Sequence, residues 1–455
     1  MIMKTPAFAA ALLAVTLLAA ALRIPGVEHD SYWVDELFTA RRMTLTFSAL
    51  LRDLEDDVQA PLYFVAAWAL VRVTGEVDAT LRYFSAVTGT LAVPATGILA
   101  AQIGGPAAGI AAAAFLAVNR FHVHFSREAR PYSLLSFLAA VSFGAAILWL
   151  RSRRTRWAVV HVVVASGLLY VHYFGSVLVA SEMAAATALA LLGGERLWWR
   201  RYVWIVILYL PWLALEVDDL GRTSFWPPPP GLHSLRQLAT QWWTPDPVLL
   251  TVTAVFLLIG IVTLARRRWP ACLFIVAWMI GPIVVAWFAS RALSFSVWVP
   301  RYLIGSLPAW AVVVGIGVAA LPRPLGRATA LSVMMLGTLI VSSHMGDRDI
   351  GPRGHADVRA ASEWISRANR SRPVEILCNR HPVALEWYLR EETAWTGKTL
   401  AEVGTPLPDR FWLLEPLERL TAAEYASIRR THRPLSSRAF GLTRATLFAR
   451  ASSAG

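Results

Sequence analysis

The chain has 455 residues, of which 56% are hydrophobic and only 16% are charged. Soluble proteins usually carry about 25% charged residues, so this composition excludes a disordered chain and argues against a soluble enzyme. Apolar runs of bilayer-spanning length recur along most of the chain and predict a polytopic membrane protein. The two cysteines, Cys272 and Cys378, offer neither a disulfide framework nor the spacing of a zinc site.

About eleven transmembrane helices are predicted from the apolar runs 6–22, 82–101, 107–124, 132–150, 157–173, 174–192, 202–215, 248–265, 270–289, 302–320 and 328–344. A further apolar run, 61–73, spans only about 20 Å as a helix, against a hydrocarbon core of about 30 Å. We expect it to form a helix that lies in the outer leaflet or dips into it. The first run also fits a cleaved signal peptide, but its removal would break the alternation of charge between turns.

Basic residues gather in the turns that lie inside if the N-terminus is cytoplasmic. The inside turns are then 102–106, 151–156, 193–201, 266–268 and 322–327. Together with Lys4 they hold 13 basic residues and one acid. Nearly all of the formal charge of +13 is therefore the positive-inside signal of a multi-pass protein in the cytoplasmic (inner) membrane. This distribution indicates membrane lipids, and not nucleic acid, as the partner of the basic residues.

Two long segments face outward in this topology. The first outer loop, 23–60, carries eight acidic residues against four arginines. The second, 216–247, contains four consecutive prolines that favour a stiff, extended chain. Together with the spans, these loops form a predicted membrane domain of residues 1–345.

The tail after Met345 is polar and carries charges of both signs. Its pattern predicts an amphipathic helix over 357–369 and strands over 374–379 and 411–416. About a hundred residues suffice for a small domain. We therefore expect residues 346–455 to form an α/β domain, placed on the extracytoplasmic (periplasmic) side by the number of spans.

Two adjacent carboxylates, Asp35 and Glu36, follow the first span and stand beside Trp33 and Phe38. A carboxylate at a membrane surface, partly shielded by aromatic rings, can hold a pKa that suits a general base. Acidic residues are also common in the first turn of a helix, where they act as caps. On residue type alone the capping interpretation is favoured.

A second polar cluster, HVHFSREARPYSLL at 122–135, crowds the outer end of one span and the start of the next. Arg127 and Arg130, with Tyr132 beside them and Glu128 between them, form a group that can bind a phosphate through charge-assisted hydrogen bonds. Long side chains that reach the membrane interface from a helix end are the simpler explanation. The histidines of this cluster, His122 and His124, point to different helix faces, so we expect packing there and not a metal site.

Three further polar groups lie on the same outer side. They contain His172 and Tyr173, Arg301 and Tyr302, and Gln59 and Tyr63. Each fits an aromatic belt at the membrane interface, but their accumulation on one side favours a functional site. Within an apolar run, Glu182 is either hydrogen-bonded to a neighbouring helix or functional.

Taken together, these segments resemble the GT-C superfamily of integral-membrane glycosyltransferases, especially its bacterial family-39 and family-83-like members. Relatives include protein O-mannosyltransferases, lipid A aminoarabinose transferases and lipid-A core galacturonosyltransferases. The matching segments occur in family order across residues 1–320 and are VDELFTA (34–40), QAPLYF (59–64), RYFSAVTGTLAVPATGILA (82–100), SREARPYSLL (126–135), VHYF (171–174) and VPRYLIGSLPA (299–309).

The resemblance implies transfer of a sugar from a polyprenyl-phosphate-linked donor to an acceptor hydroxyl outside the cytoplasmic membrane. The resemblance leaves the acceptor open among a lipid such as lipid A, a polysaccharide and a protein, and direct displacement would invert the anomeric centre. Asp35 matches the expected catalytic base, with Glu36 in support, and Arg130 and Arg301 match positions near the donor phosphate. The remaining residues of the outer clusters are candidates for substrate binding, namely Gln59, Tyr63, Arg127, Glu128, Tyr132, His172, Tyr173 and Tyr302.

The chain departs from some relatives, because its second cluster has Glu128 and no aspartate, and Gln59 and Ala60 replace a charged or proline residue. A divalent metal therefore stays open, and no other cofactor is implied. The alternative function is a transporter or flippase of lipid-linked sugars. Transporters place their polar site at the bilayer midplane within repeated halves, whereas here the polar residues gather outside and no repeat is visible.

Overall fold

In this computed structural model the described residues are 5–28, 31–57, 59–192, 199–216, 228–293, 295–344, 357–369, 374–379, 383–389, 395–404, 406–415 and 420–451. They fold as two compact units. The first comprises Met1–Val27 and Leu45–His344, and the second comprises Glu28–Thr44 and Met345–Gly455. Much of the predicted second outer loop, residues 217–227, lies outside the described residues.

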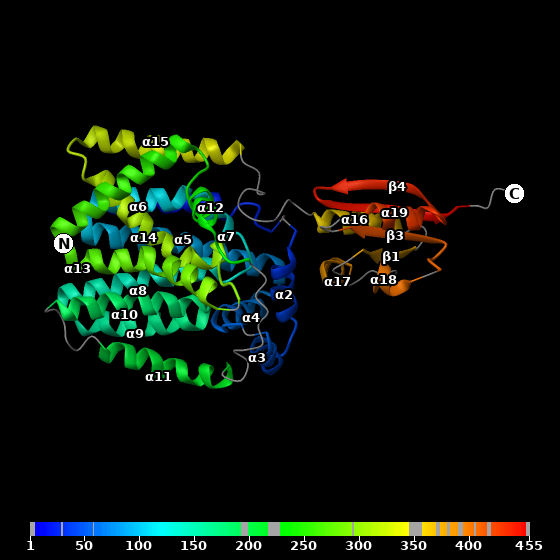
Figure 1. Ribbon diagram of the computed structural model, residues 1–455, viewed down its shortest axis with the longest axis horizontal. Coiled ribbons are helices and arrows are strands. Elements are labelled where there is room, and N and C mark those ends of the chain that lie inside the picture. The colour runs from blue at the N-terminus through cyan, green and yellow to red at the C-terminus, as the bar shows by residue number, and fades with distance from the viewer. Residues whose placement is uncertain are drawn as a thin grey trace. The chain divides into compact units, whose positions relative to one another are not determined.

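The first unit is a bundle of helices (Figure 1). In chain order they are α1 (Pro6–Arg23), α3 (Phe47–Asp56), α4 (Leu62–Thr74), α5 (Val77–Gly104), α6 (Pro106–Val118), α7 (Arg120–Ser126), α8 (Tyr132–Ser152), α9 (Thr155–Val171), α10 (Phe174–Leu191), α11 (Trp199–Glu216), α12 (Leu232–Trp242), α13 (Pro247–Ala292), the 3₁₀ helix η2 (Pro300–Ser306), α14 (Leu307–Ala319) and α15 (Pro324–His344). Each of the predicted spans lies in this helical framework, and the run 61–73 forms the helix α4. The prediction of an α-helical polytopic membrane protein is confirmed.

The predicted spans form helices of different lengths, and only some are long enough to cross a membrane by themselves. Among the described residues, six helices are long and apolar enough to cross a membrane, or seven if the bent pair α6–α7 counts as one. The spans predicted at 157–173 and 328–344 correspond to shorter apolar segments of α9 and α15, of the same class as α4. Those predicted at 248–265 and 270–289 are the two limbs of the 46-residue helix α13.

Two helices are interrupted where the sequence supplies a physical reason. Helices α6 and α7 meet at a 62° bend, where the side chain of Asn119 accepts a hydrogen bond from the amide of His122 and caps α7. Helix α13 kinks at Arg268, whose backbone is not helical, two residues before Pro270. A proline inside a helix removes one backbone hydrogen bond and clashes with the preceding turn.

Glycines bring α13 and α14 into close contact at the centre of the bundle. A Cβ atom on Gly317 of α14 would collide with the carbonyl oxygen of Phe256 in α13, and one on Gly260 of α13 would collide with that of Val313. Small residues let membrane helices pack backbone against backbone. Helix α14 is consequently buried over most of its length.

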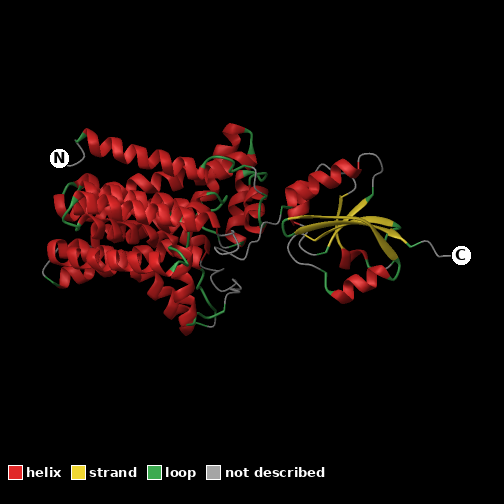
Figure 2. Cartoon of the chain, turned by 90° about the horizontal axis from the view of Figure 1, so that it is seen from above, coloured by secondary structure: helices red, strands yellow, loops and turns green. Residues whose placement is uncertain are grey.

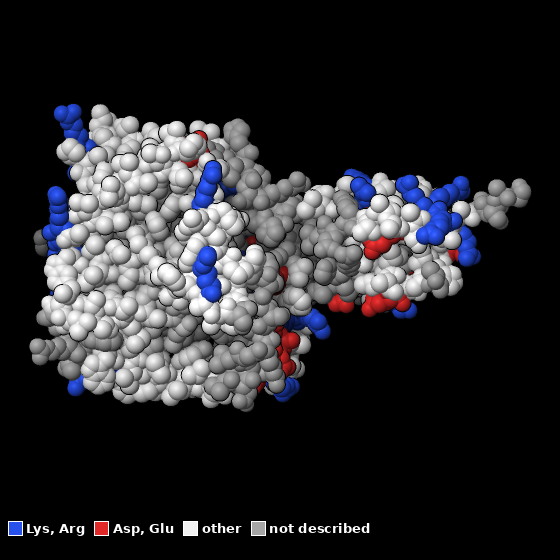
Figure 3. Space-filling model, in the orientation of Figure 1, with Lys and Arg blue, Asp and Glu red and all other residues white. Residues whose placement is uncertain are grey.

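The lateral surface of the helical unit is apolar. Figure 3 shows few charged side chains on the visible side of this unit, with Lys and Arg at the end of the bundle where α1 begins. Exposed apolar side chains project from several helices, among them Leu17, Val163, Trp204 and Phe288. Such a surface suits contact with lipid. Arg151 donates a hydrogen bond to the carbonyl of Gln102 and so joins two of the turns predicted to lie inside.

The second unit contains a five-stranded sheet with helices on both faces (Figure 2). Strand order is β2-β1-β3-β5-β4, where β1 pairs in parallel with β2 and β3, and β5 pairs antiparallel with β3 and β4. The elements are α16 (Val358–Asn369), β1 (Glu375–Cys378), α17 (Val383–Tyr388), β2 (Trp395–Thr399), α18 (Leu400–Val403), β3 (Arg410–Glu415), α19 (Ala422–Arg429), β4 (His432–Phe440) and β5 (Thr443–Arg450). The predicted helix and two strands are present as α16, β1 and β3, in a small α/β fold.

The core of this sheet is built from alternate strand residues. Leu377 of β1, Phe411 and Leu413 of β3 and Phe448 of β5 are buried together and packed against Ile428 of α19. Residues two apart on a strand face the same side of a sheet, so one face of three adjacent strands supplies this core.

Helix α2 (Val34–Arg42) belongs to the second unit, although it lies far from the other members in sequence. All of 23–60 was predicted to belong to the membrane domain, whereas Glu28–Thr44 fold with the C-terminal residues. The chain therefore leaves the helical unit after Val27 and returns to it at Leu45.

Candidate active site

The predicted acidic pair occupies the first turn of α2 in the second unit. Glu36 is buried, and its Oε2 accepts a hydrogen bond from the backbone N–H of Trp33 at 3.2 Å. This contact satisfies one of the amides that a helix leaves without an intrahelical partner at its N-terminus. Residue type alone did not show which of the two acids caps the helix. The structure shows that Glu36 does. Asp35 is partly buried, one residue before it.

Arg130 lies in the turn between α7 and α8 and is almost fully buried. Its guanidinium stands over the ring of Phe64 in α4, 5.7 Å from the centroid. Its carbonyl accepts a hydrogen bond from the hydroxyl of Ser85 in α5 at 3.3 Å. The hydroxyl oxygens of Ser85 and Tyr63 are 2.9 Å apart. Three segments, α4, α5 and the α7–α8 turn, therefore hold Arg130 and Tyr63 together.

Arg301 brings a second arginine to the same neighbourhood. From η2, its Nε donates a hydrogen bond to the hydroxyl of Tyr132, at the start of α8, with a distance of 2.9 Å. The ring of Tyr302 is 6.3 Å from that of Tyr132 and 4.8 Å from that of His172. Residues from three parts of the chain thus converge in what we call the arginine–tyrosine cluster, made of Arg130, Tyr132, His172, Arg301 and Tyr302.

His172 lies between α9 and α10, outside both helices. The backbone N–H of Phe174 donates to its Nδ1 at 3.1 Å, so the neutral ring carries its proton on Nε2. Burial lowers the pKa of His172 to about 3, and the positive charges of Arg130 and Arg301 contribute to this lowering. Two cations, a neutral imidazole donor and tyrosine hydroxyls form a set of groups that suits a phosphate.

Two predicted residues of the 122–135 segment make local contacts. Arg127 donates a hydrogen bond to the carbonyl of Pro25, just past the end of α1, at 2.9 Å. The carboxylate of Glu128, which is buried, lies 3.1 Å from Nε2 of His124 one turn earlier. These contacts fix the α7–α8 turn that carries Arg130.

Gln59 and Tyr173 are the remaining predicted binding residues. Gln59 is partly buried between α3 and α4, and its backbone N–H donates to the carbonyl of Leu54 at 2.8 Å. Tyr173 is partly buried at the N-cap of α10, directly after His172. Tyr173 thus adjoins the arginine–tyrosine cluster through the chain.

His122 packs, as expected. It is fully buried, with Nδ1 3.0 Å from a guanidinium nitrogen of Arg23 and Nε2 3.1 Å from the hydroxyl of Ser136. Arg23 also donates to the carbonyl of Ala117 at 2.9 Å. These bonds tie the end of α1 to the bend between α6 and α7.

Glu182 is hydrogen-bonded to neighbouring helices, which was the first of its two predicted roles. From α10, one carboxylate oxygen accepts a hydrogen bond from Ser142 of α8 at 2.8 Å, and the other lies 2.9 Å from Nε2 of His161 in α9. Nδ1 of His161 is 3.3 Å from a guanidinium nitrogen of Arg201 in α11, which stands over Trp149. This buried network joins four helices.

The described residues contain no group of three His, Cys, Asp or Glu side chains placed to hold a metal ion. His29 and Asp30, which precede the acidic pair, lie outside the described residues.

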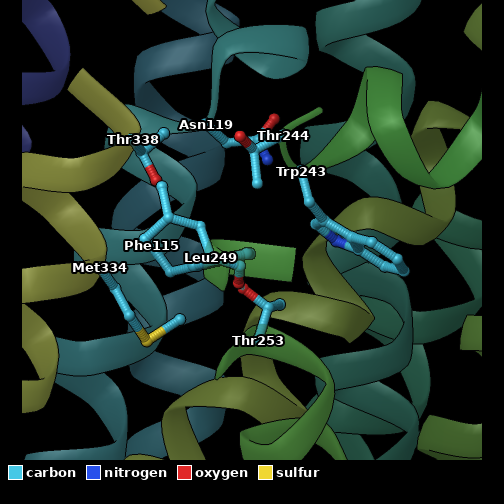
Figure 4. Close-up of a pocket in the computed structure, with 8 residues that line it drawn as sticks. All are labelled: Phe115, Asn119, Trp243, Thr244, Leu249, Thr253, Met334 and Thr338. Carbon is cyan, nitrogen blue, oxygen red and sulfur yellow. Dashed lines mark hydrogen bonds between the residues drawn. The ribbon is translucent and has the colours of Figure 1, made fainter. Parts of the chain in front are cut away.

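A small cavity lies among α6, α13 and α15 (Figure 4). Its lining consists of Phe115, Asn119, Trp243, Thr244, Leu249, Thr253, Met334 and Thr338. In Figure 4, Asn119 and Thr244 lie close together on one side, with Met334 and Thr253 on the opposite side. A neighbouring apolar crevice shares Phe115 and Met334 with it.

Sequence reasoning did not single out Phe64 and Ser85, which hold Arg130. Phe64 follows Tyr63 in the segment QAPLYF, so that motif contains the signal that would have found it. Ser85 is one hydroxyl among several in α5, and nothing in the sequence distinguishes it.

Comparison with known proteins finds no matching family model and no matching curated sequence. The fold, however, is that of ArnT from Cupriavidus metallidurans, in crystal structures of the apo state and of the complex with undecaprenyl phosphate. Their TM-scores are 0.61 and 0.60, with 14% identity over 98% of this chain and 98% of theirs. The archaeal oligosaccharyltransferase AglB from Archaeoglobus fulgidus, in complex with an inhibitory peptide and a dolichol-phosphate, has a TM-score of 0.59 at 11% identity. It covers 87% of this chain, which spans 64% of AglB. ArnT and AglB are both GT-C glycosyltransferases, so the resemblance is confirmed at the level of the fold.

Proposed function

We propose that this chain is a glycosyltransferase that moves a sugar from a polyprenyl-phosphate-linked donor to an acceptor hydroxyl on the outer side of the cytoplasmic membrane. The observation that carries the proposal is the arginine–tyrosine cluster, set in the fold of two glycosyltransferases. In the compared structures, ArnT is bound to undecaprenyl phosphate and AglB is in complex with a dolichol-phosphate.

The two arginines bind the donor phosphate in this proposal. Negative charge develops on the phosphate oxygen as its bond to the anomeric carbon breaks, and fixed cations stabilise that charge. Arg301 is oriented by Tyr132, and Arg130 is oriented by its position over Phe64. Each guanidinium offers a planar pair of N–H groups that matches two phosphate oxygens.

Asp35 is the general base. It takes the proton of the acceptor hydroxyl while the acceptor oxygen forms a bond with the anomeric carbon. The bond between that carbon and the phosphate oxygen breaks, and its electron pair leaves with the polyprenyl phosphate. Attack opposite to the leaving group inverts the anomeric centre. Glu36 supports Asp35 by holding the start of α2.

The test begins with the purified full-length protein and a series of polyprenyl-phosphate sugars, with release of polyprenyl phosphate as the readout. Mass spectrometry of envelope glycans from cells with and without the protein then identifies the acceptor. We expect one sugar to be missing from one glycan, lipid or protein. Movement of the lipid-linked sugar across vesicle membranes without cleavage would contradict the proposal and favour a flippase.

Asp35→Asn separates the catalytic role from a structural one. Asparagine retains the size of the side chain and is as good a helix-capping residue as aspartate, so folding and donor binding are expected to persist. Turnover is expected to fall by about 10²–10⁴. The matched control is Asp246→Asn, because Asp246 caps α13 by accepting from the amides of Val248 and Leu249. Equal turnover in the two variants would remove Asp35 from the mechanism.

A further inference from the structure

The segment before α2 is bound by the C-terminal domain through a set of hydrogen bonds within the second unit. The hydroxyl of Ser31 donates to the carboxylate of Asp357 at 2.7 Å and accepts from the backbone N–H of Arg359 at 3.0 Å. The guanidinium of Arg359 donates to the carbonyl of Glu28 at 2.7 Å. Three hydrogen bonds thus join Ser31 and the backbone of Glu28 to Asp357 and Arg359.

Asp357 is itself held in place by secondary structure. Its Oδ1, the atom that accepts from Ser31, also accepts from the amide of Ala360 at 3.0 Å at the start of α16. The backbone N–H of Asp357 donates to the carbonyl of Phe440 at the end of β4. The anchor for Ser31 is therefore a helix cap connected to the sheet, and not a flexible surface side chain.

A second anchor lies on α17. The backbone N–H of Tyr32 donates to the hydroxyl of Tyr388 at 2.6 Å, and the ring of Tyr32 packs against Trp387 with centroids 6.5 Å apart. Tyr32 is only 2% exposed. Because its N–H is shielded from water, loss of the tyrosine hydroxyl leaves a buried donor without that acceptor.

These anchors lead directly to the acidic pair. Ser31 and Tyr32 are followed by Trp33, whose N–H is bound by Glu36, and α2 begins at Val34. The direction in which α2 starts, and with it the position of Asp35, is set by the two anchors.

We infer that the C-terminal domain is a positioning element for the catalytic base, with Tyr388 and Asp357 as positioning residues that act through the 31–36 segment. This inference rests on the proposed function of Asp35. It assigns to the domain a role in turnover, because the hydrogen bonds described above hold the segment that leads to the base.

The test uses the full-length protein with Tyr388→Phe, alone and combined with Ser31→Ala. Tyr425→Phe is the matched control, since Tyr425 lies on α19 of the same domain and packs against Phe448. We expect kcat of the double variant to fall about 10²-fold, the usual effect of displacing a catalytic group by about 1 Å. The KM for the donor is expected to stay unchanged, and the Tyr425→Phe control should behave as wild type in both parameters.

Hydrogen exchange supplies a readout that does not depend on activity. Amides of residues 31–42 should exchange faster in Tyr388→Phe and faster still in the double variant. Amides of the five-stranded sheet should exchange at the wild-type rate in both variants. Unchanged exchange and unchanged kcat in the double variant would overturn the inference while leaving the proposed function intact. A rise in donor KM at constant kcat would also overturn it and would assign the domain to donor binding. If the wild-type protein transfers no sugar, the proposed function fails, and exchange alone decides whether these anchors hold α2.

Discussion

Arg301 and Tyr132 are 169 residues apart in sequence, yet their side chains form one hydrogen bond in the arginine–tyrosine cluster. The amino-acid types at both positions predicted polar groups at helix ends, and the family resemblance predicted that Arg301 lies near the donor phosphate. The pairing itself depends on how η2 packs against the start of α8. Periodicity along one helix contains no information on that contact.

Replacement of Arg301 by lysine tests the shape of the guanidinium separately from its charge. Lysine keeps the positive charge but loses the planar fork and the Nε–H bond to Tyr132. Hydrogen bonds to charged groups contribute about 1.5–3 kcal/mol, so donor affinity is expected to fall about ten- to a hundred-fold. Titration of a polyprenyl-phosphate sugar measures the change. Arg154→Lys, in the exposed turn between α8 and α9, is the control; equal affinity in both variants would exclude Arg301 from the donor site.

Glu182 is predicted to stabilise the helical unit without taking part in turnover. Glu182→Ala leaves Ser142 and His161 without their carboxylate partner. A buried polar group without a partner costs about 1–3 kcal/mol, so the melting temperature is expected to drop measurably in a thermal unfolding scan. Glu363→Ala, at an exposed position of α16, should leave the melting temperature unchanged. Loss of turnover in a Glu182→Ala protein that remains folded and binds donor would instead indicate a functional carboxylate.

The acidic pair Asp35 and Glu36 shows how far residue type alone can assign roles to side chains. Sequence identified two carboxylates at a helix start and two possible roles, capping and catalysis. The structure assigns the capping hydrogen bond to Glu36, because the third helical residue can fold back to the amide that precedes the helix. The role of Asp35 stays a prediction that turnover of Asp35→Asn tests.

Among the elements, the membrane helices were the most predictable, because a continuous apolar run of sufficient length has one stable form in a bilayer. The strands β2, β4 and β5 were not predicted. Nearly all of β4 is exposed, so its sequence lacks the alternation of apolar residues that marks a half-buried strand. The placement of α2 in the second unit was also missed, since no local pattern records a contact across more than 300 residues.

Close packing of α13 and α14 yields a prediction at this scale. Gly317→Ala places a Cβ against the carbonyl of Phe256, and backbone cannot move aside as a flexible side chain does. Overpacking typically costs about 1–3 kcal/mol, so the variant should melt at a lower temperature. Gly326→Ala is the matched control, because no atom lies within 4 Å of its Cβ position. A melting temperature equal to wild type for Gly317→Ala would show that the two helices separate at little cost.

For the molecule as a whole, the charge pattern predicts which side of the membrane each end occupies. A reporter that is active only in the cytoplasm, fused after Gly455, should be silent. The same reporter inserted after Arg154, within the basic turn 151–156, should be active. The reverse pattern would invert the assignment of every outer cluster, including the arginines proposed to bind the donor.

The bond between Ser31 and Asp357 also sets an order of events during synthesis. The two residues are 326 positions apart, and ribosomes add about 5–20 residues per second, so the second emerges roughly 15–65 s after the first. Throughout that interval the segment that leads into α2 is already made, while the domain that anchors it does not yet exist. The polar contacts of Ser31 and Tyr32 are therefore among the last to form. The segment that carries the proposed base is therefore fixed in place only after the C-terminal domain has been made.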